Sequence, residues 1–556
     1  MLALCFVRLF ALIALVSASP VPSRPPRTVA ALCKLPLIGK LCPKAPGEVT
    51  INTPLGVARG TQTSPTTSRF VVRYATAQRW GLPVQASTWA MPGNDVTKLP
   101  PMCPQPNVDA SAYSEDCLHM AIYTPSSVSS IPSNVPVLVW IHGGSFVVGS
   151  ASGAGLDGSA LAKATNSIVV VLQYRLGVLG FVPPSVANSN TNLGVRDVIT
   201  ALKFINMAIP QFGGNQNKIT VAGQSSGAQM IRALLASPDA AGLFSYAALH
   251  SDTMDYGFYK PATITAFQSY LFKNASTALA ACSDIGCLRN VPTPEIMNAQ
   301  NNLLNDAASL DPAAAGGSPI RPFHDGQLLQ YTLTGTSFPA AQKNILVFTV
   351  KDEAASTIGR AYQTSIPATY VDPVIQGYYQ GTPRAEKIVQ SGNYDPDTYS
   401  SQAGVAPDDE ARAALTQLFT DALWRCPSWT FSRSWASKGG KVFTGVFQLG
   451  ATYPSNQNVA YCAGKACHED DIYILFGTTP SPTPAQTALT QEIQARYSAF
   501  MRTGNPNAAS RASWAQSGSA DVAALKLGGS GNQPAEACDP SFWGNAVPYD
   551  YQIFGL

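Results

Sequence analysis

The sequence carries little charge, and the charge that it has is nearly balanced. Only 12% of its 556 residues are Asp, Glu, Lys or Arg, and 36 basic residues stand against 33 acidic ones. No run of five like charges occurs, which argues against a nucleic-acid partner. Beyond the N-terminal segment no apolar stretch is long enough for a membrane span, and residues 549–556 lack the apolar tail of a lipid-anchor signal. We therefore expect no stable membrane insertion.

Apolar residues, glycine and proline are plentiful instead. Hydrophobic residues make up 46% of the chain, with 44 Gly and 43 Pro, a composition that excludes a disordered chain, a collagen and a long coiled coil. Short apolar segments alternate with helical patterns, which is typical of a mostly parallel sheet flanked by helices. The predicted strands are residues 137–141, 168–172, 219–222 and 345–350. We expect an α/β fold in which residues 255–340 and 360–430 form inserted cap segments.

The N-terminus has the features of an export signal. Arg8 precedes an apolar run from Leu9 to Val16, and Ser17 and Ala18 follow as small residues before a cleavage point, although residues 2–7 are already apolar. We predict a signal peptide over residues 1–18, a Pro-rich lead-in over 19–44 and one large domain over 45–556. The mature protein is expected to be secreted and extracellular.

Ten of the eleven cysteines remain once Cys5 has left with the signal peptide, and an even number in an oxidising compartment predicts five disulfides. Sequence proximity suggests the pairs Cys33–Cys42, Cys103–Cys117, Cys282–Cys287 and Cys462–Cys467, which leaves Cys426 for Cys538. A metal site at Cys462, Cys467 and the adjacent His468 is the alternative, but exported thiols oxidise and no second Cys/His cluster lies nearby. Asn274 begins an Asn-Ala-Ser sequon and is a predicted glycosylation site.

Residues 223–227, GQSSG, match the pattern G-x-S-x-G between a predicted strand and a predicted helix. There the glycines permit a strained turn that lifts the serine hydroxyl clear of the sheet at a helix N-terminus. The same letters also occur by chance in ordinary turns, but the strand before and the helix after favour a nucleophile. We predict that Ser225 is this nucleophile.

A serine hydroxyl becomes reactive only when an imidazole takes its proton. His119 and His250 lie in or beside predicted strands, His142 lies in a glycine loop, and His324 lies in a predicted turn. His468 alone lies in a polar loop late in the chain. In α/β-hydrolases the order is Ser, then Asp or Glu, then His, so the acid is either Glu353 or its neighbour Asp352 at the end of strand 345–350.

Attack on an ester carbonyl creates an oxyanion that needs preorganised N–H donors. Ser226, next to the nucleophile, supplies one backbone donor. The segment His142–Phe146 follows strand 137–141 and is rich in glycine, so we expect the N–H groups of Gly144 and Ser145 to supply the others.

With these motifs in order, the chain resembles the type-B carboxylesterase/lipase family, which includes cholinesterases and fungal lipases, over roughly residues 45–550. Five further segments carry the likeness: SEDCL at 114–118, FGGN at 212–215, KDEA at 351–354, HEDD at 468–471 and TGNPN at 503–507. The resemblance implies that Glu353 is the acid and His468 the base, and it also suggests the pairs Cys103–Cys117, Cys282–Cys287 and Cys426–Cys538. By the same analogy Ser251 supports the triad from behind.

The chain departs from the family pattern at four points. The residue before the nucleophile is Gln224, where the family often has Glu, so a charge at the active-site gorge is lost. The loop between Cys103 and Cys117 holds no Trp for a cation–π platform, which makes a cholinesterase improbable. Ser145 replaces a glycine and is expected to narrow the space for bulky alcohols, and Ser226 replaces an alanine.

We therefore expect a secreted serine carboxylic-ester hydrolase that forms an acyl-enzyme on Ser225 and needs no cofactor or metal. The alternatives are a lipase on longer-chain acylglycerols and a feruloyl-type aryl esterase, so the substrate is either a small-molecule or a lipid ester. Only thirteen residues separate Cys103 from Cys117, which is short for a lipase lid and favours the esterase. A non-catalytic adhesion protein on the same fold is disfavoured because all three triad members are present. Oligomeric state and the acyl and alcohol groups stay open.

Overall fold

The computed structural model describes residues 47–545, except for residues 129–133, 188–189, 275–276, 316–317, 331–341 and 403. The predicted signal peptide over 1–18, the lead-in over 19–44 and the pair Cys33–Cys42 lie outside the described residues. Ala275 and Ser276 of the sequon are also outside them, whereas Asn274 is described and exposed.

A large sheet organises the described chain, with strands in the order β1-β2-β3-β6-β8-β7-β9-β10-β11-β12-β13. Neighbouring strands are antiparallel from β1 to β8 and parallel from β8 to β13. The strands are β1 (Glu48–Thr53), β2 (Gly56–Ser64), β3 (Thr67–Arg73), β6 (His119–Pro125), β7 (Val135–Ile141), β8 (Ile168–Leu172), β9 (Gly214–Gln224), β10 (Tyr246–His250), β11 (Asn344–Val350), β12 (Val442–Phe447) and β13 (Leu525–Leu527). A separate pair consists of β4 (Ala75–Thr76) and β5 (Val84–Gln85).

Helices cover both faces of this sheet, because the alternating side chains of its strands are apolar on both sides. Along β7, Val137 and Ile141 pack into one core and Trp140 packs into the other. The first core is covered by α4 (Gly177–Phe181), α5 (Leu193–Ala208) and α6 (Ser226–Ala236), and the second by α3 (Ser159–Thr165), α15 (Asp471–Phe476) and α16 (Pro484–Thr503). The predicted mostly parallel sheet with flanking helices is confirmed.

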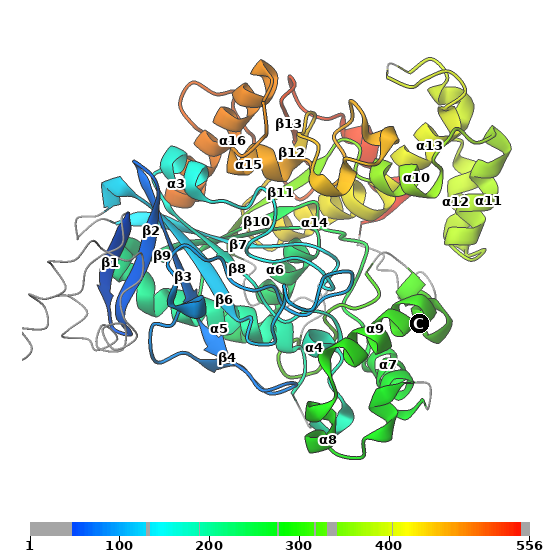
Figure 1. The fold of residues 1–556 in the computed structure, drawn as a ribbon. Coiled ribbons are helices and arrows are strands. Elements are labelled where there is room, and N and C mark those ends of the chain that lie inside the picture. The colour runs from blue at the N-terminus through cyan, green and yellow to red at the C-terminus, as the bar shows by residue number, and fades with distance from the viewer. Residues whose placement is uncertain are drawn as a thin grey trace, which may run out of the picture.

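The inserted segments form two groups of helices on the side of the sheet away from β1 (Figure 1). The first group is α7 (Pro261–Lys273), α8 (Ile285–Asn290) and α9 (Thr293–Leu310). The second is α10 (Ala355–Ala361), α11 (Val371–Tyr378), α12 (Pro383–Ser391) and α13 (Glu410–Phe419), and it has an apolar core of its own. A π-helical segment, Thr420–Arg425, joins α13 to α14 (Cys426–Ser437), and α17 (Pro540–Trp543) lies near the end of the described chain.

The strand order places a topological switch point in the parallel part of the sheet, between β7 and β9. β8 lies on one side of β7 and β9 lies on the other, so the chain reverses its direction of progress across the sheet at this point. Loops that leave the carboxyl ends of two such strands separate and leave room for a ligand. The segment after Ile141 and the turn after Gln224 are these two loops, and both were singled out in the sequence.

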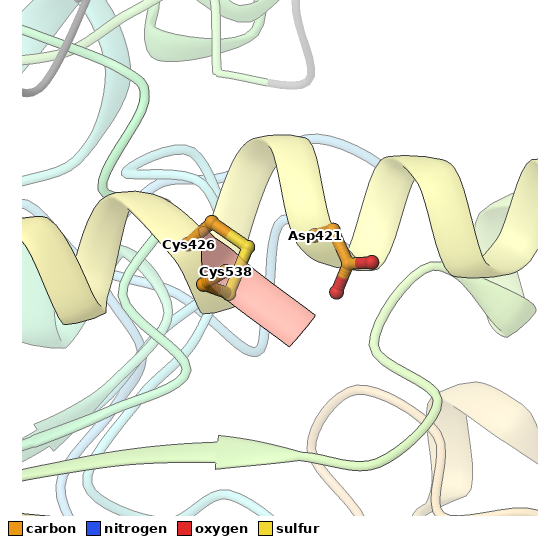
Figure 2. Close-up of side chains that lie close together, drawn as sticks. All are labelled: Asp421, Cys426 and Cys538. Carbon is orange, nitrogen blue, oxygen red and sulfur yellow. A yellow bond between two sulfur atoms is a disulfide. The ribbon is translucent and has the colours of Figure 1, made fainter. Parts of the chain in front are cut away.

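Four of the five expected disulfides fall on described residues, and all four are bonded: Cys103–Cys117, Cys282–Cys287, Cys426–Cys538 and Cys462–Cys467. The pair Cys426–Cys538 ties the start of α14 to a segment 112 residues further along the chain (Figure 2). Within the described residues, no helix combines the length and the apolar character needed to cross a membrane.

Candidate active site

Ser225 occupies the sharp turn between β9 and α6. Its backbone has φ 56° and ψ −125°, a conformation that L-residues rarely adopt, and its N–H donates to the carbonyl of His250 at 2.9 Å. Strain of this kind persists only where the surrounding structure imposes it, and it is concentrated at functional sites. Ser225 is 9% exposed, so most of this residue is buried in the turn.

The two glycines of the turn are required because a side chain at either position would clash with the neighbouring backbone. A Cβ on Gly227 would lie 2.2 Å from the carbonyl oxygen of Ile141, and one on Gly223 would lie 2.8 Å from the same oxygen. No side chain fits at such distances, because real Cβ contacts are always longer than 3 Å. Glycine at both positions therefore allows the turn to sit directly against the end of β7, where the glycine loop begins.

The predicted base and the predicted acid are hydrogen-bonded to each other. Nδ1 of His468 lies 2.7 Å from Oε2 of Glu353, whose other oxygen accepts the backbone N–H of Val350 at 2.9 Å. Glu353 is fully buried, and the side chain of His468 is 17% exposed. A carboxylate can only accept, so Nδ1 carries the proton and Nε2 keeps its lone pair. This tautomer is the one that a general base requires.

The charges around His468 favour its protonated form. Burial of the ring lowers the pKa of His468, but the hydrogen bond and charge of Glu353 raise it, and so do the charges of Glu469 and Asp471. The net result is a pKa above the ordinary 6.5. A base of this kind becomes active as pH rises through that pKa.

Nε2 of His468 makes a contact that the sequence did not indicate. Its partner is the side-chain amide nitrogen of Gln224, at 3.2 Å. The hydroxyl of Ser225 makes no hydrogen bond within the described part of the chain. From sequence, Gln224 was judged only as the loss of a negative charge, because a contact between residues 244 positions apart leaves no local pattern.

Asp352, the alternative acid, contacts the loop that carries the base. Its backbone N–H donates to the carbonyl of Ala466 at 3.0 Å, and its carboxylate accepts the N–H of Ala466 at 3.1 Å. The disulfide Cys462–Cys467 closes the same loop directly before His468. These bonds hold the backbone of the base in place, while Glu353 reaches the ring.

The glycine loop after β7 leaves two backbone donors unused. Gly144 and Ser145 have φ values of 108° and 54°, and neither N–H has an acceptor among the described residues. The next N–H, that of Phe146, donates to Oγ of Ser226 at 3.2 Å. The serine that replaces the family's alanine thus joins the glycine loop to the nucleophile turn. This role of the Ser226 side chain was not anticipated from the sequence.

His142, at the start of the glycine loop, is a packing residue. Its ring stacks on Tyr174 with centroids 4.8 Å apart, and the Tyr174 hydroxyl donates to the His142 carbonyl at 3.1 Å. Burial lowers its pKa to about 4, so the ring is neutral at physiological pH and adds no charge beside the turn.

The remaining histidines are His119, His324 and His250. Burial lowers the pKa of His119 to about 4 in β6 and also lowers the pKa of His324. His250 is fully buried, with Nδ1 2.6 Å from Oδ2 of Asp471 and Nε2 bonded to the Tyr497 hydroxyl. The hydroxyl of Ser251, expected by analogy behind the triad, is buried and has no hydrogen-bond partner in the described structure.

A tryptophan next to the predicted base was also not anticipated from the sequence. The ring of Trp424 lies 5.4 Å from the ring of His468, and its indole N–H is buried without a partner among the described residues. Trp424 belongs to the π-helical segment Thr420–Arg425, and single turns of this type often occur at functional sites. Neither composition nor periodicity identifies such a turn, because it differs from an α-helix only in hydrogen-bond pairing.

Asp421, Cys426 and Cys538 bring three potential metal-ligand atoms within 4.8 Å of one another (Figure 2). The two sulfurs are bonded to each other, so neither is a free thiolate. The Asp421 carboxylate already binds Arg425 at 2.8 Å and the amide of Gln417 at 2.7 Å. The cluster is thus a disulfide beside a satisfied ion pair. Likewise, the sulfurs next to His468 are joined to each other.

Comparisons with known proteins agree with this geometry. The model of the carboxylesterase family matches residues 47–543. Carboxylesterase 1D of Rattus norvegicus is 27% identical over 477 residues, covering 78% of this chain and 80% of the relative. Cocaine esterase of Homo sapiens is 28% identical over 424 residues, covering 73% and 70%. A solved PNB esterase superposes with a TM-score of 0.67 at 25% identity, covering 86% of this chain and 95% of its own. The chain therefore belongs to the carboxylesterase family and is a carboxylic-ester hydrolase.

Proposed function

We propose that the protein hydrolyses esters through an acyl-enzyme on Ser225, with His468 as the base and Glu353 as the residue that orients it. The observation that carries the proposal is the 2.7 Å bond from His468 Nδ1 to Glu353, which leaves the lone pair of Nε2 directed toward the nucleophile turn. The strained backbone of Ser225 and its place at the topological switch point are independent support.

In the first half-reaction, Ser225 Oγ bonds to the carbonyl carbon while its proton passes to Nε2 of His468. The oxyanion accepts hydrogen bonds from the N–H groups of Gly144, Ser145 and Ser226, which are fixed before the reaction begins. The tetrahedral intermediate then collapses, the bond to the alcohol oxygen breaks, and that oxygen takes the proton from His468. The alcohol leaves and the acyl group stays on Ser225 as an ester.

In the second half-reaction, water replaces the alcohol. His468 takes a proton from water as the water oxygen bonds to the acyl carbon, and the same donors hold the oxyanion. Collapse returns the proton to Ser225 Oγ and releases the carboxylic acid. The buried charge of Glu353 stabilises the imidazolium in both halves, so its 2.7 Å bond to the ring acts twice in each turnover.

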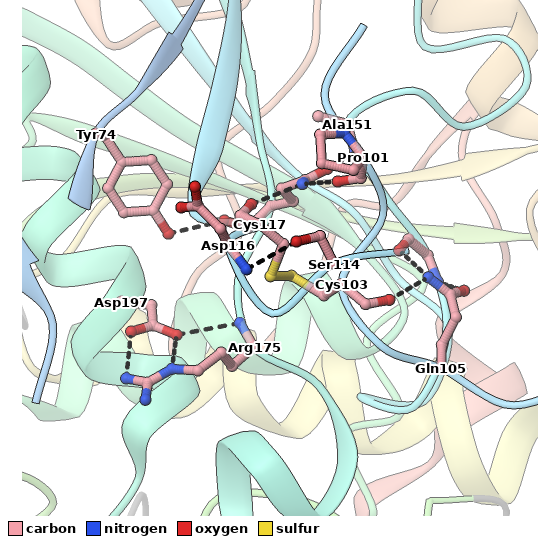
Figure 3. The surroundings of a disulfide bond; sticks show 12 residues. Tyr74, Pro101, Cys103, Gln105, Ser114, Asp116, Cys117, Ala151, Arg175 and Asp197 are labelled. Atoms are coloured by element: carbon pink, nitrogen blue, oxygen red, sulfur yellow. Dashed lines mark hydrogen bonds and ion pairs between the residues drawn. A yellow bond between two sulfur atoms is a disulfide. The ribbon is translucent and has the colours of Figure 1, made fainter. Parts of the chain in front are cut away.

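We further propose an esterase for short acyl chains, because the segment in the position of a lipase lid is clamped. The disulfide Cys103–Cys117 closes it, and the amide of Gln105 both donates to and accepts from the backbone of Gly149, at 3.0 and 2.9 Å (Figure 3). Arg79 adds a bond to Glu115 in the same segment at 3.0 Å. Opening on a lipid surface would break the hydrogen bonds of Gln105 and Arg79 together.

The mechanism is tested by Ser225→Ala on p-nitrophenyl esters from acetate to palmitate. We expect kcat to fall by about 10⁴–10⁶-fold with little change in melting temperature, because the hydroxyl acts only in the reaction. Ser237→Ala is the matched control, since Ser237 ends the same helix and its buried hydroxyl has no partner within the described residues. Near wild-type turnover by Ser225→Ala would refute the mechanism.

The same ester series tests the substrate class when emulsified triglyceride is included. The clamped segment predicts the highest kcat/KM on short acyl chains and no jump in rate when an emulsion forms. A preference for emulsified long chains would replace the esterase proposal with the lipase.

We also propose that residues 45–556 form one catalytic domain that is secreted after removal of residues 1–18 and carries a glycan on Asn274. Four bonded disulfides support secretion. The exposure of Asn274 supports glycosylation at this residue. Expression of the full chain in a eukaryotic host should give protein in the medium that begins near residue 19. Its glycosidase-induced mobility shift should vanish in Asn274→Gln. Retention of the full chain inside the cells would contradict secretion.

A further inference from the structure

Gln224 is the one side chain bonded to the reacting nitrogen of the base in the described structure. It is fully buried at the end of β9, and its amide nitrogen lies 3.2 Å from Nε2 of His468. Its amide oxygen is buried without a hydrogen-bond partner among the described residues. A buried amide that satisfies its donor on an imidazole and leaves its acceptor unsatisfied is an unusual arrangement for a residue with a purely structural role.

The bond has a defined direction. Nδ1–H of His468 donates a hydrogen bond to Glu353, so Nε2 of the neutral ring can only accept, and the NH₂ group of Gln224 is the donor. The lone pair of Nε2 is also what must receive the proton of Ser225. Two donors therefore compete for one acceptor, and in this structure the donor is Gln224.

We propose that Gln224 is a positioning residue that occupies Nε2 of His468 in the resting enzyme and must release it before Ser225 can be activated. The proposal rests on the proposed roles of Ser225 and His468. Release is needed in every turnover, because Nε2 becomes a donor once it is protonated, and the NH₂ group of Gln224 can then no longer bind it.

The amide of Gln224 lies between the ring of His468 and the glycine loop. Its oxygen lies against the glycine loop, 2.9 Å from where a Cβ of Gly143 would be, so the missing side chain at Gly143 leaves the space that the amide occupies. The same glycine loop carries the donors for the oxyanion, so the amide contacts both halves of the site.

Gln224 also affects the equilibrium between the neutral and the protonated ring of His468. The charged groups that act on His468 are Glu353, Glu469 and Asp471, and all three favour the imidazolium. The NH₂ group of Gln224 acts in the opposite sense, because it binds only the neutral ring. Removal of this donor should make the ring harder to deprotonate and at the same time free Nε2 for Ser225.

The pH profile of kcat/KM separates the change in the pKa of His468 from the freeing of Nε2 for Ser225. Gln224→Met keeps the volume of the side chain and removes the amide. We expect the acid limb to move to higher pH and the plateau above it to rise by roughly three- to tenfold, the range of a neutral hydrogen bond. Gln224→Glu places a carboxylate on Nε2 and should move the acid limb upward by about one pH unit or more, without the gain in plateau.

Gln300→Met is the matched control. Gln300 is 1% exposed, its amide oxygen accepts the N–H of Val178 at 2.9 Å, and its amide nitrogen has no partner in the described structure. The substitution therefore removes a buried hydrogen bond between α9 and α4 and none to the base. It should change the melting temperature about as much as Gln224→Met does and leave the pH profile unchanged.

The outcomes distinguish this inference from the proposed mechanism. An unshifted acid limb and an unchanged or lower plateau in Gln224→Met would overturn the role of Gln224, while Ser225→Ala stays inactive. If Gln224→Met does not fold, an acid limb in Gln224→Glu that stays in place or moves to lower pH overturns it instead. High activity in Ser225→Ala would remove the mechanism on which both proposals depend.

Discussion

The described part of the chain contains two histidine–carboxylate pairs with nearly the same geometry. In one pair, Nδ1 of His468 lies 2.7 Å from Glu353, and in the other, Nδ1 of His250 lies 2.6 Å from Asp471. They differ at the second ring nitrogen. Nε2 of His468 contacts Gln224 beside the nucleophile turn, and Nε2 of His250 is bonded to the hydroxyl of Tyr497 in the core.

The difference indicates that a carboxylate on Nδ1 is not by itself enough to identify a histidine as a candidate base. His468 is 17% exposed on its side chain and its Nε2 partner can be displaced, whereas His250, Asp471 and Tyr497 are fully buried. The second pair therefore acts as a fixed hydrogen-bond network. It still contributes to the site, because the carbonyl of His250 accepts the N–H of Ser225 at 2.9 Å and holds the turn in place.

The largest effect that would separate the two pairs is expected from His468→Asn. The amide of Asn can still donate to Glu353, so the buried carboxylate keeps a partner, but no group remains to take the proton of Ser225. We expect kcat to fall by about 10³–10⁶-fold with a change in melting temperature of only about 2 °C. Steady-state kinetics and thermal unfolding measure the two quantities. A large loss of stability without a loss of kcat would mean that the two pairs had been assigned the wrong way round.

His250→Phe should give the opposite result. The substitution keeps an aromatic ring against Phe348, whose ring lies 4.3 Å away, but it leaves Asp471 and Tyr497 without their partner. Two buried groups without hydrogen bonds cost about 2–5 kcal/mol. We expect a lower urea midpoint and, in the folded protein at low temperature, kcat/KM within about tenfold of wild type. A thousandfold loss of kcat at an unchanged midpoint would contradict this assignment.

The smallest effect concerns the charge of Asp471, the partner of His250, which raises the pKa of His468. The wild-type acid limb of kcat/KM should lie above pH 6.5, because Glu353 and Asp471 raise the pKa of His468 and the base works only when neutral. Removal of a negative charge lowers that pKa, so activity then persists to lower pH. We expect a shift of about half a pH unit in Asp471→Asn and a larger one in Glu353→Gln. An acid limb in Asp471→Asn that moves upward would show that the charge of Asp471 does not act on His468.

Much of the scaffold was predictable because it is encoded locally. The predicted strand 168–172 coincides with β8, and the predicted strand 345–350 falls one residue short of the start of β11. Runs of β-branched residues that end in polar residues specify such strands without reference to the rest of the chain. The turn around Ser225 was predictable for the same reason, since the glycines, the strand and the helix are adjacent in sequence.

The contacts of the site were less predictable because they join distant segments. Gln224 and His468 lie 244 positions apart, and Trp424 reaches the base through a π-helical turn that no sequence period marks. The role of Ser226 is similar, because its hydroxyl binds a loop 80 positions earlier. Such contacts depend on how loops dock at the edge of the sheet.

The sequence by itself determined the chemical groups, their order along the chain and the strands that carry them. It supplied five histidines and several carboxylates, and the resemblance of its motifs to a known family suggested the pair of His468 with Glu353, whereas the pair of His250 with Asp471 was not predicted. Only the tertiary structure decided what meets the second nitrogen of each ring. The packing of α15 and α16 against the sheet buries His250 against Tyr497, while the loop closed by Cys462–Cys467 presents His468 to the nucleophile turn. The reactivity of an imidazole as a base is set by this environment, because proton transfer needs a free lone pair on the ring and a proton donor within reach.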